Sequence, residues 1–339
     1  MGDFLIYTRQ DIDHLISRRP GETKFGERVV TIETGDWEKE LRVSKAKFVL
    51  IGIPEDIGVR ANFGVGGAHT AWMPALKAIL NVQDTKLLHG NDVIVLGAFD
   101  FTGQMTKAQE ADVDTLRELV SFIDDTVHPL IEKVVNAGKV PIVIGGGHNN
   151  CFPILKGASE AKGVAVNCIN LDAHSDYRIM EGRHSGNGFR YAHREGFLNK
   201  YEIIGLHENY NSQDVIEELT DDPDIQFCYY EDIFLREKIS FYEAVEKAID
   251  RTAGKPTGIE LDLDCIERIL SSAATPSGIP VLCARQYIYW CASETNALYL
   301  HLTEGAKELR DGRADAYAPK LIAYLVTDFI KAYRKNKAP

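Results

Sequence analysis

The sequence lacks the features that mark several classes of protein. None of its six cysteines belongs to a Cys-x-x-Cys pair, and several lie in apolar runs, so we expect buried free thiols, as in a reducing cytoplasm. No uncharged apolar stretch approaches the ~20 residues that a membrane helix needs. The first residues, MGDFLIYTRQ, show no basic segment followed by an apolar run, so we expect no secretory signal. These absences predict a cytoplasmic protein that makes no membrane contact.

Positive charge is also scarce. The 339 residues include 38 Lys and Arg against 50 Asp and Glu, a formal net charge of -12. An acidic surface repels nucleic acid and anionic membranes, which excludes both as partners. An acidic cavity can instead hold divalent cations or the cationic group of a small-molecule substrate. A homo-oligomer is left open.

Internal repeats, low-complexity segments and flexible linkers are absent as well. Short apolar runs alternate with longer amphipathic stretches. Because the runs show little polar alternation, they predict strands buried on both faces, which is typical of parallel sheets. The runs are 46–53, 93–97, 140–144, 164–171, 201–206, 225–229, 258–263 and 297–302.

The stretches between the runs predict helices, most clearly at 112–137, 241–253 and 319–333, where apolar residues recur at spacings of three and four. Alternation of strand and helix predicts a three-layer α/β/α architecture around a mostly parallel, roughly eight-stranded sheet. With no linker in view, we expect a single domain over 1–339, with 1–40 as an N-terminal extension packed on it.

A glycine-rich turn follows the run at 140–144. Gly145-Gly146-Gly147 allows a sharp turn that would place His148 at the tip of a strand, where open parallel sheets bind ligands. The turn lacks the Lys-Ser/Thr of a Walker loop and the spacing of Gly-x-Gly-x-x-Gly. This signal is weak alone, because a histidine at a strand end is commonly structural.

Two further runs lead into acidic residues. Asp172, His174 and Asp176 occupy alternate positions, so their side chains would share one side of an extended segment. Asp262 and Asp264 alternate with apolar residues in the same way. Burying carboxylates this close together is costly unless a cation neutralises them. The alternatives are a solvated turn for the first segment and a water-facing edge strand for the second.

Taken together, two imidazoles and four carboxylates are too many ligands for one transition metal and suit two metals with bridging carboxylates. The oxygen-rich shell favours Mn²⁺ over Zn²⁺, although Fe²⁺ or Co²⁺ would accept the same ligands. Two metals about 3.5–4 Å apart can share one water and lower its pKa. The predicted ligands are His148, Asp172, His174, Asp176, Asp262 and Asp264.

The three motifs resemble those of the ureohydrolases, the superfamily of arginase, agmatinase and formimidoylglutamase. The likeness rests on Gly-Gly-Gly-His at 145–148, Asp-Ala-His-Ser-Asp at 172–176 and Asp-Leu-Asp at 262–264, in the same order, and extends over about 48–304. It implies an arginase-like fold, a dinuclear manganese centre and hydrolysis of carbon–nitrogen bonds in linear amidines.

The resemblance also implies which ligands bind each metal. His148 and Asp176 would serve one manganese, His174 and Asp264 the other, and Asp172 and Asp262 would bridge or be shared. Asp176 would also act in catalysis, by accepting a hydrogen bond from a bridging hydroxide.

His184 follows the second motif in Arg183-His184-Ser185-Gly186-Asn187. It is our candidate for the group that gives a proton to the leaving nitrogen, because histidine titrates in the required range. The alternative is a loop histidine without a role.

The substrate is indicated by departures from arginase. The segment 277–286 replaces the arginase Gly-Gly-Leu-Thr, and Tyr289 aligns near the glutamate that binds guanidinium. The segment 58–68 resembles one that contacts the substrate in formimidoylglutamase. Formimidoylglutamate carries two carboxylates, which Arg60 and Arg285 would bind as bidentate partners, with hydrogen bonds from Asn62 and Asn187. For Arg60, a surface salt bridge is the alternative.

We therefore expect a formimidoylglutamase, which converts N-formimidoyl-L-glutamate and water to L-glutamate and formamide in histidine degradation. One alternative is another ureohydrolase, such as an agmatinase, arginase or guanidino-acid hydrolase, in which Glu304 is a spare acid that could bind a cation. The other is a non-catalytic protein stabilised by metal.

Overall fold

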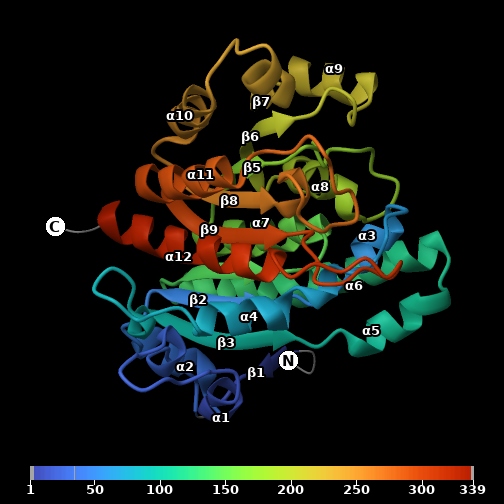
Figure 1. Cartoon of the computed structure of the whole chain (residues 1–339). Helices are drawn as coiled ribbons and strands as arrows, with labels where there is room; N and C mark the ends of the chain where they lie inside the picture. Colours follow the sequence, from blue (N-terminus) through green and yellow to red (C-terminus); the bar gives the residue numbers. More distant parts are fainter. Residues whose placement is uncertain (1–3, 34, 337–339) are drawn as a thin grey trace.

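A computed structural model describes residues 4–33 and 35–336, and within them one nine-stranded sheet dominates the molecule (Figure 1). The strand order is β1-β3-β2-β4-β9-β8-β5-β6-β7. Strand β1 is antiparallel to β3, whereas the other neighbours pair in parallel. The strands are β1 (Phe4–Ile6), β2 (Phe48–Gly52), β3 (Val93–Phe99), β4 (Val140–Ile144), β5 (Val166–Leu171), β6 (Leu198–Leu206), β7 (Ile225–Tyr229), β8 (Pro256–Asp262) and β9 (Asn296–Thr303).

The predicted mostly parallel α/β architecture is confirmed, and each predicted apolar run overlaps a strand. The ninth strand, β1, was not predicted, because it is only three residues long and lies at the edge of the sheet. It belongs to the segment that we expected to be an extension. That segment also buries Ile12 and Phe25 completely, so it packs as part of the body of the molecule.

Helices cover both faces of the sheet, and two hydrophobic clusters fill the interfaces (Figure 1). In β2, for example, alternate residues enter opposite clusters: Phe48 and Leu50 join one, and Val49 and Ile51 join the other. On one face lie α4 (Trp72–Leu80), α10 (Phe241–Thr252), α11 (Val281–Glu294) and α12 (Ala318–Asn336). On the other lie α2 (Trp37–Val43), α6 (Val113–Asn136), α7 (Cys151–Lys162), α8 (Gly188–Arg194) and α9 (Gln213–Asp221).

Shorter elements connect these layers. They include α1 (Arg9–Asp13), α3 (Ile57–Ala61) and α5 (Thr102–Lys107), and 3₁₀ turns at His148–Asn150, Ser185–Asn187 and Leu263–Cys265. Across the described part of the chain, no helix has both the length and the apolar character needed to cross a membrane. The predicted helices at 112–137, 241–253 and 319–333 correspond to α6, α10 and α12.

The centre of the sheet positions the chemistry. Strands β4, β9, β8 and β5 are neighbours and run in parallel, so their carboxyl ends meet at one edge. The chain that leaves these ends carries His148, Glu304, Asp262 and Asp172. Residues far apart in the sequence therefore converge at the place where open α/β sheets bind their ligands.

Candidate metal centre

The glycine-rich turn after β4 directs His148 into the interior. Gly145 and Gly146 have φ values of 93° and 78°, a left-handed conformation that favours glycine. His148 then begins a 3₁₀ turn, and its side chain is fully buried. The sharp turn that the sequence predicted therefore places the imidazole directly against the ends of the neighbouring strands.

The structure brings all six predicted ligands together in two groups that share Asp172. In the first group, His148 Nδ1 lies 3.2 Å from an oxygen of Asp172, 2.8 Å from Asp176 and 3.2 Å from Asp262. In the second, His174 Nδ1 lies 3.6 Å from Asp172 and 3.2 Å from Asp264. Within each group, the candidate ligand atoms all lie within 4.8 Å of one another.

The donor set fits divalent cations. His148 Nδ1 and Asp264 Oδ1 are buried without a hydrogen-bond partner, although charged groups surround both. Burial, together with the neighbouring carboxylates, raises the pKa of Asp176 to about 6 and that of Asp262 well above its ordinary value. Burial acts to raise the pKa of Asp172, but the adjacent imidazoles of His148 and His174 outweigh it and lower that pKa. So dense a set of buried carboxylates requires positive charge to be stable, and two cations would supply it.

Glu304 adds a seventh polar group at this edge. It follows β9 directly, is buried, and has a left-handed backbone with a φ of 60°. Its Oε1 accepts a hydrogen bond of 2.9 Å from the backbone N–H of His148. Burial raises the pKa of its carboxyl to about 8, and the charges of Asp264 and Asp176 add to this effect. Tyr289, which the alignment put in place of an acidic substrate ligand, instead lies on α11 and packs against the core.

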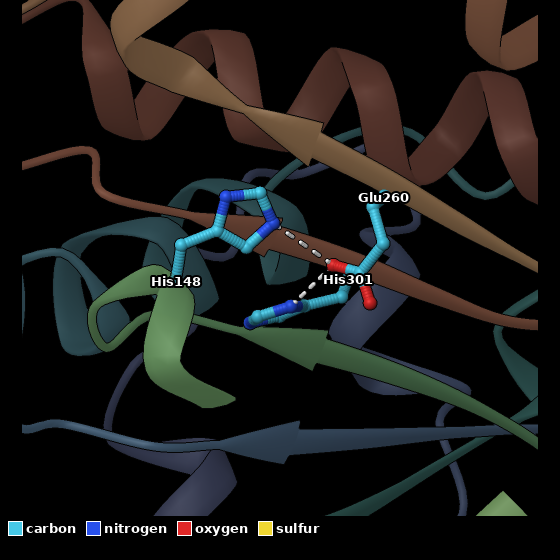
Figure 2. Close-up of side chains that lie close together, drawn as sticks. All are labelled: His148, Glu260 and His301. Carbon is cyan, nitrogen blue, oxygen red and sulfur yellow. Dashed lines mark hydrogen bonds and ion pairs between the residues drawn. The ribbon is translucent and has the colours of Figure 1, made fainter. Parts of the chain in front are cut away.

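Glu260 lies beside Nε2 of His148 (Figure 2), whereas the aspartates lie beside Nδ1. It is fully buried on β8, two residues before Asp262. Its carboxylate accepts hydrogen bonds from Tyr299 of β9 at 2.8 Å and from His301 of the same strand at 2.6 Å. Neither of these two β9 residues was selected from the sequence.

The loop after Asp176 contains His184 and Asn187, and both have partners within the loop. The amide of Asn187 accepts from Arg183 and from the backbone N–H of His184, and it donates to the carbonyls of Ile179 and Gly182. The side-chain donor and acceptor of Asn187 are thus both engaged within the loop. Asn187 therefore stabilises the loop and has no free group to bind a substrate.

His184 is fully buried, and its Nδ1 accepts a hydrogen bond of 3.1 Å from the backbone N–H of Gly186. Burial and the nearby cations of Arg117, Arg178 and Arg183 lower the pKa of its imidazole to about 3. The ring is therefore neutral at pH 7. These surroundings do not support the predicted role of His184 as the acid that protonates the leaving nitrogen.

Arg285 is not brought to the site. It lies on α11, where its guanidinium donates to Asp328 of α12 at 2.6 and 3.1 Å and stacks 4.6 Å from the ring centroid of Tyr324. Asp328 satisfies the bidentate geometry that we expected a substrate carboxylate to satisfy. The predicted carboxylate clamp therefore needs a different residue.

Arg60 lies on α3, and Asn62 directly follows this helix. The Arg60 guanidinium donates to the backbone carbonyl of Ala108 and lies 3.8 Å from the carboxylate of Asp56. Asn62 Nδ2 is 3.4 Å from Ser185 Oγ. Arg60 is thus occupied by protein partners, whereas Asn62 reaches the loop that follows Asp176.

Arg178 was not selected from the sequence, but it lies on that same loop, two residues after Asp176. Its backbone N–H donates to the carbonyl of Gly186 at 2.9 Å. A Cβ at Gly186 would come within 2.9 Å of Arg178 Cδ and 2.8 Å of Asn62 Nδ2, so these two side chains meet over Gly186. The side chain of Arg178 is 56% exposed, and its guanidinium has only a loose contact of 3.7 Å with Glu181.

The model of the arginase family matches residues 46–282, which is more than half of the chain. The chain belongs to the arginase family. Among curated relatives, the formimidoylglutamase of Hahella chejuensis is 30% identical over 191 residues, covering 52% of this chain and 53% of that protein. The formimidoylglutamase of Streptococcus pyogenes serotype M3 is 27% identical over 232 residues, or 64% of each chain. The chain thus matches less than two thirds of the length of these relatives.

Solved structures of the arginase family share the fold over most of this chain. Formimidoylglutamase from Bacillus subtilis superposes with a TM-score of 0.73 at 18% identity, covering 94% of both chains. Trypanosoma cruzi formiminoglutamase, solved with Mn²⁺, has a TM-score of 0.70 at 19% identity and covers 94% of this chain and 100% of its own. A hypothetical agmatinase from Burkholderia thailandensis also has a TM-score of 0.70, at 16% identity, covering 91% of this chain and 90% of its own.

Proposed function

We propose that this arginase-family chain is a formimidoylglutamase that hydrolyses N-formimidoyl-L-glutamate to L-glutamate and formamide. The observation that carries the proposal is the convergence of two imidazoles and four carboxylates at the carboxyl edge of the central strands. The curated relatives named above, which are formimidoylglutamases, support the choice of substrate.

Two Mn²⁺ ions are the cofactor that we propose for this centre. His148 and Asp176 would hold one, His174 and Asp264 the other, and Asp172 and Asp262 would be shared. When bound, such a pair would supply Lewis acidity and lower the pKa of a water at the site. The protein contributes the placement: Asp176 reaches the first group through a left-handed backbone with a φ of 46°, so the loop holds this carboxylate in a strained position.

In the proposed reaction, water adds to the formimino carbon and the bond from that carbon to the glutamate nitrogen breaks. The oxygen of the water stays on the carbon, which leaves as formamide. One proton of the water goes to the formimino nitrogen, and the other goes to the departing nitrogen, which leaves as the amine of glutamate. Asp176 would accept the hydrogen bond from the attacking water. As His184 is neutral and faces its own loop, we assign it no proton transfer.

The two ends of the substrate would meet different groups. The positive charge of the formimino group would favour the ionised form of Glu304, which is buried beside the proposed ligands and would accept hydrogen bonds from that group. Arg178, exposed on the loop that carries Asp176, would pair with a substrate carboxylate in place of Arg285, and Asn62 beside it would add a hydrogen bond.

A second candidate is hydrolysis of a guanidino compound by the same centre. Glu304 favours it, because a buried carboxylate can pair with a guanidinium as well as with a formimino group. The two candidates differ at the far end of the substrate, where a glutamate moiety needs a cation such as Arg178 and the amine of agmatine would be repelled by it.

The test is turnover by metal-stripped protein reloaded with Mn²⁺. N-formimidoyl-L-glutamate, arginine, agmatine and guanidinobutyrate are assayed in parallel, with Asp176→Asn as the inactive control. We expect Mn²⁺-dependent release of formamide from the first substrate only, and none from the variant. Release of urea from a guanidino compound would show that the proposed substrate is wrong. No turnover of any substrate, with two metals bound, would favour a non-catalytic role.

A further inference from the structure

The imidazole of His148 has two nitrogens, and each faces a different set of acids. Nδ1 points to the aspartates of the first metal group, at 2.8–3.2 Å. Nε2 faces Glu260, whose Oε2 lies 3.5 Å away (Figure 2), and it has no hydrogen-bond partner among the described residues. The ring is fully buried, and the ring of Phe189 packs edge-on against it at a centroid distance of 5.0 Å. A ligand imidazole must offer a lone pair at Nδ1, so its proton must be at Nε2, the nitrogen that faces Glu260.

Glu260 is itself held in place from β9. Glu260 and His301 are direct partners in the parallel register of β8 and β9, and Gly258 pairs with Tyr299 two positions earlier. His301 Nδ1 lies 2.6 Å from Oε2 of the carboxylate, and the hydroxyl of Tyr299 donates to Oε1 at 2.8 Å. Both oxygens therefore have a donor, and both donors are anchored on the neighbouring strand.

Gly258 makes this arrangement sterically possible. A Cβ at that position would come within 2.3 Å of Cζ and Oη of Tyr299. The missing side chain leaves room for the tyrosine ring to lie across β8 and reach Glu260. The two strands are thus built around the carboxylate, which is fully buried.

We propose that Glu260 is a positioning residue for the first metal. Its carboxylate accepts the Nε2–H of His148, selects the tautomer with a free lone pair at Nδ1, and fixes the plane of the ring. Partners of this kind behind a ligand histidine affect metal affinity strongly. The inference rests on the proposed dinuclear centre and is independent of the substrate.

The experiment measures Mn²⁺ binding to metal-stripped protein by calorimetry, with the metal content per chain counted after dialysis. In Glu260→Gln we expect the affinity of one of two sites to fall about 10- to 100-fold and that of the other to stay unchanged. His174→Asn should weaken Mn²⁺ binding at the site that contains Asp264. Comparison of the two variants then shows which binding step belongs to which site. Glu202→Gln, which removes a buried carboxylate from β6, is the matched control and should weaken neither.

A second, smaller change tests the same proposal in case Glu260→Gln fails to fold. Tyr299→Phe removes only the hydroxyl that holds Glu260, and we expect the same site to weaken by about threefold to tenfold. Two unweakened sites in folded Glu260→Gln would overturn the proposal. So would three metals per wild-type chain with the third lost in Glu260→Gln, since the candidate ligand atoms of His148, Glu260 and His301 also lie within 4.8 Å of one another. If wild type bound no Mn²⁺, the dinuclear centre itself would be wrong. If it bound two metals without turnover, the proposed enzyme function would be wrong, and the proposed role of Glu260 would still stand.

Discussion

Two arginines show how side-chain partners distinguish a substrate ligand from a structural residue. Arg285 already has a carboxylate partner, Asp328, and an aromatic ring beneath its guanidinium. Arg178 has only a loose contact with Glu181, although it belongs to the loop that carries Asp176. A substrate carboxylate gains little from the first guanidinium, because it would have to displace Asp328, whereas the second is accessible.

We therefore predict that Arg178→Ala raises KM for N-formimidoyl-L-glutamate by about 10- to 100-fold and changes kcat less, because one charge-assisted interaction is lost. Arg285→Ala is the matched control. It should leave KM unchanged and lower the thermal midpoint, since Asp328 loses its partner. Steady-state kinetics of both variants measure these effects. A raised KM in Arg285→Ala and an unchanged KM in Arg178→Ala would instead support Arg285 as the residue that binds the substrate carboxylate.

Local sequence patterns were sufficient to select the six proposed ligands, because each acid or histidine follows a strand end or alternates along an extended segment. The partners from other strands could not be selected in this way. His301 acquires a role only when β9 is placed beside β8 in the observed register. The role of Glu55 is likewise visible only in the folded structure. There it accepts hydrogen bonds from Asn149 and Asn150, the two residues that follow His148.

At the scale of elements, β6 and α10 are joined through a second buried carboxylate. Glu202 of β6 is 3% exposed and accepts a hydrogen bond of 2.6 Å from Arg251 of α10. Burial raises the pKa of this carboxyl to about 7, although Arg251 acts in the opposite direction. The folded protein therefore holds the proton of Glu202 more tightly than the unfolded chain does.

This difference predicts how stability depends on pH. Between the unfolded pKa of about 4.5 and the folded pKa of about 7, the folded state binds more protons, so the free energy of unfolding should fall as pH rises. We expect Glu202→Gln to remove about 1–3 kcal/mol of that fall. Urea unfolding of both metal-free proteins at pH 5 and pH 7.5 measures it. A wild type that gains stability over this range relative to the variant would show that Arg251 keeps the carboxylate charged.

For the whole molecule, the sequence predicted the class of fold but not the order of the strands. The apolar runs revealed eight strands and the helices between them, because both faces of a parallel sheet are buried. Nothing local indicates that β4 lies beside β9, which is more than 150 residues later in the chain. That long-range pairing brings the turn with His148 and the strand end with Glu304 to the same edge, and thereby completes the centre.

Because the ligands come from distant segments, cations bound between them should stabilise the whole fold. The unfolded chain does not assemble either group, so metal binding adds directly to the free energy of unfolding. At 100 times the dissociation constant, each site contributes about 2.7 kcal/mol. For a chain of this size, removal of Mn²⁺ by a chelator should then lower the thermal midpoint by about 5–10 °C.

The matched variant is Asp172→Asn, since Asp172 belongs to both groups. Its thermal midpoint, followed by circular dichroism over a series of Mn²⁺ concentrations, should show little of the rise seen in wild type. An equal rise in the variant would place the stabilising metal elsewhere. If the thermal midpoint of wild type did not change with Mn²⁺, the folded chain would be stable with its carboxylates buried and no cations bound. Asp176 and Asp262 would then be protonated.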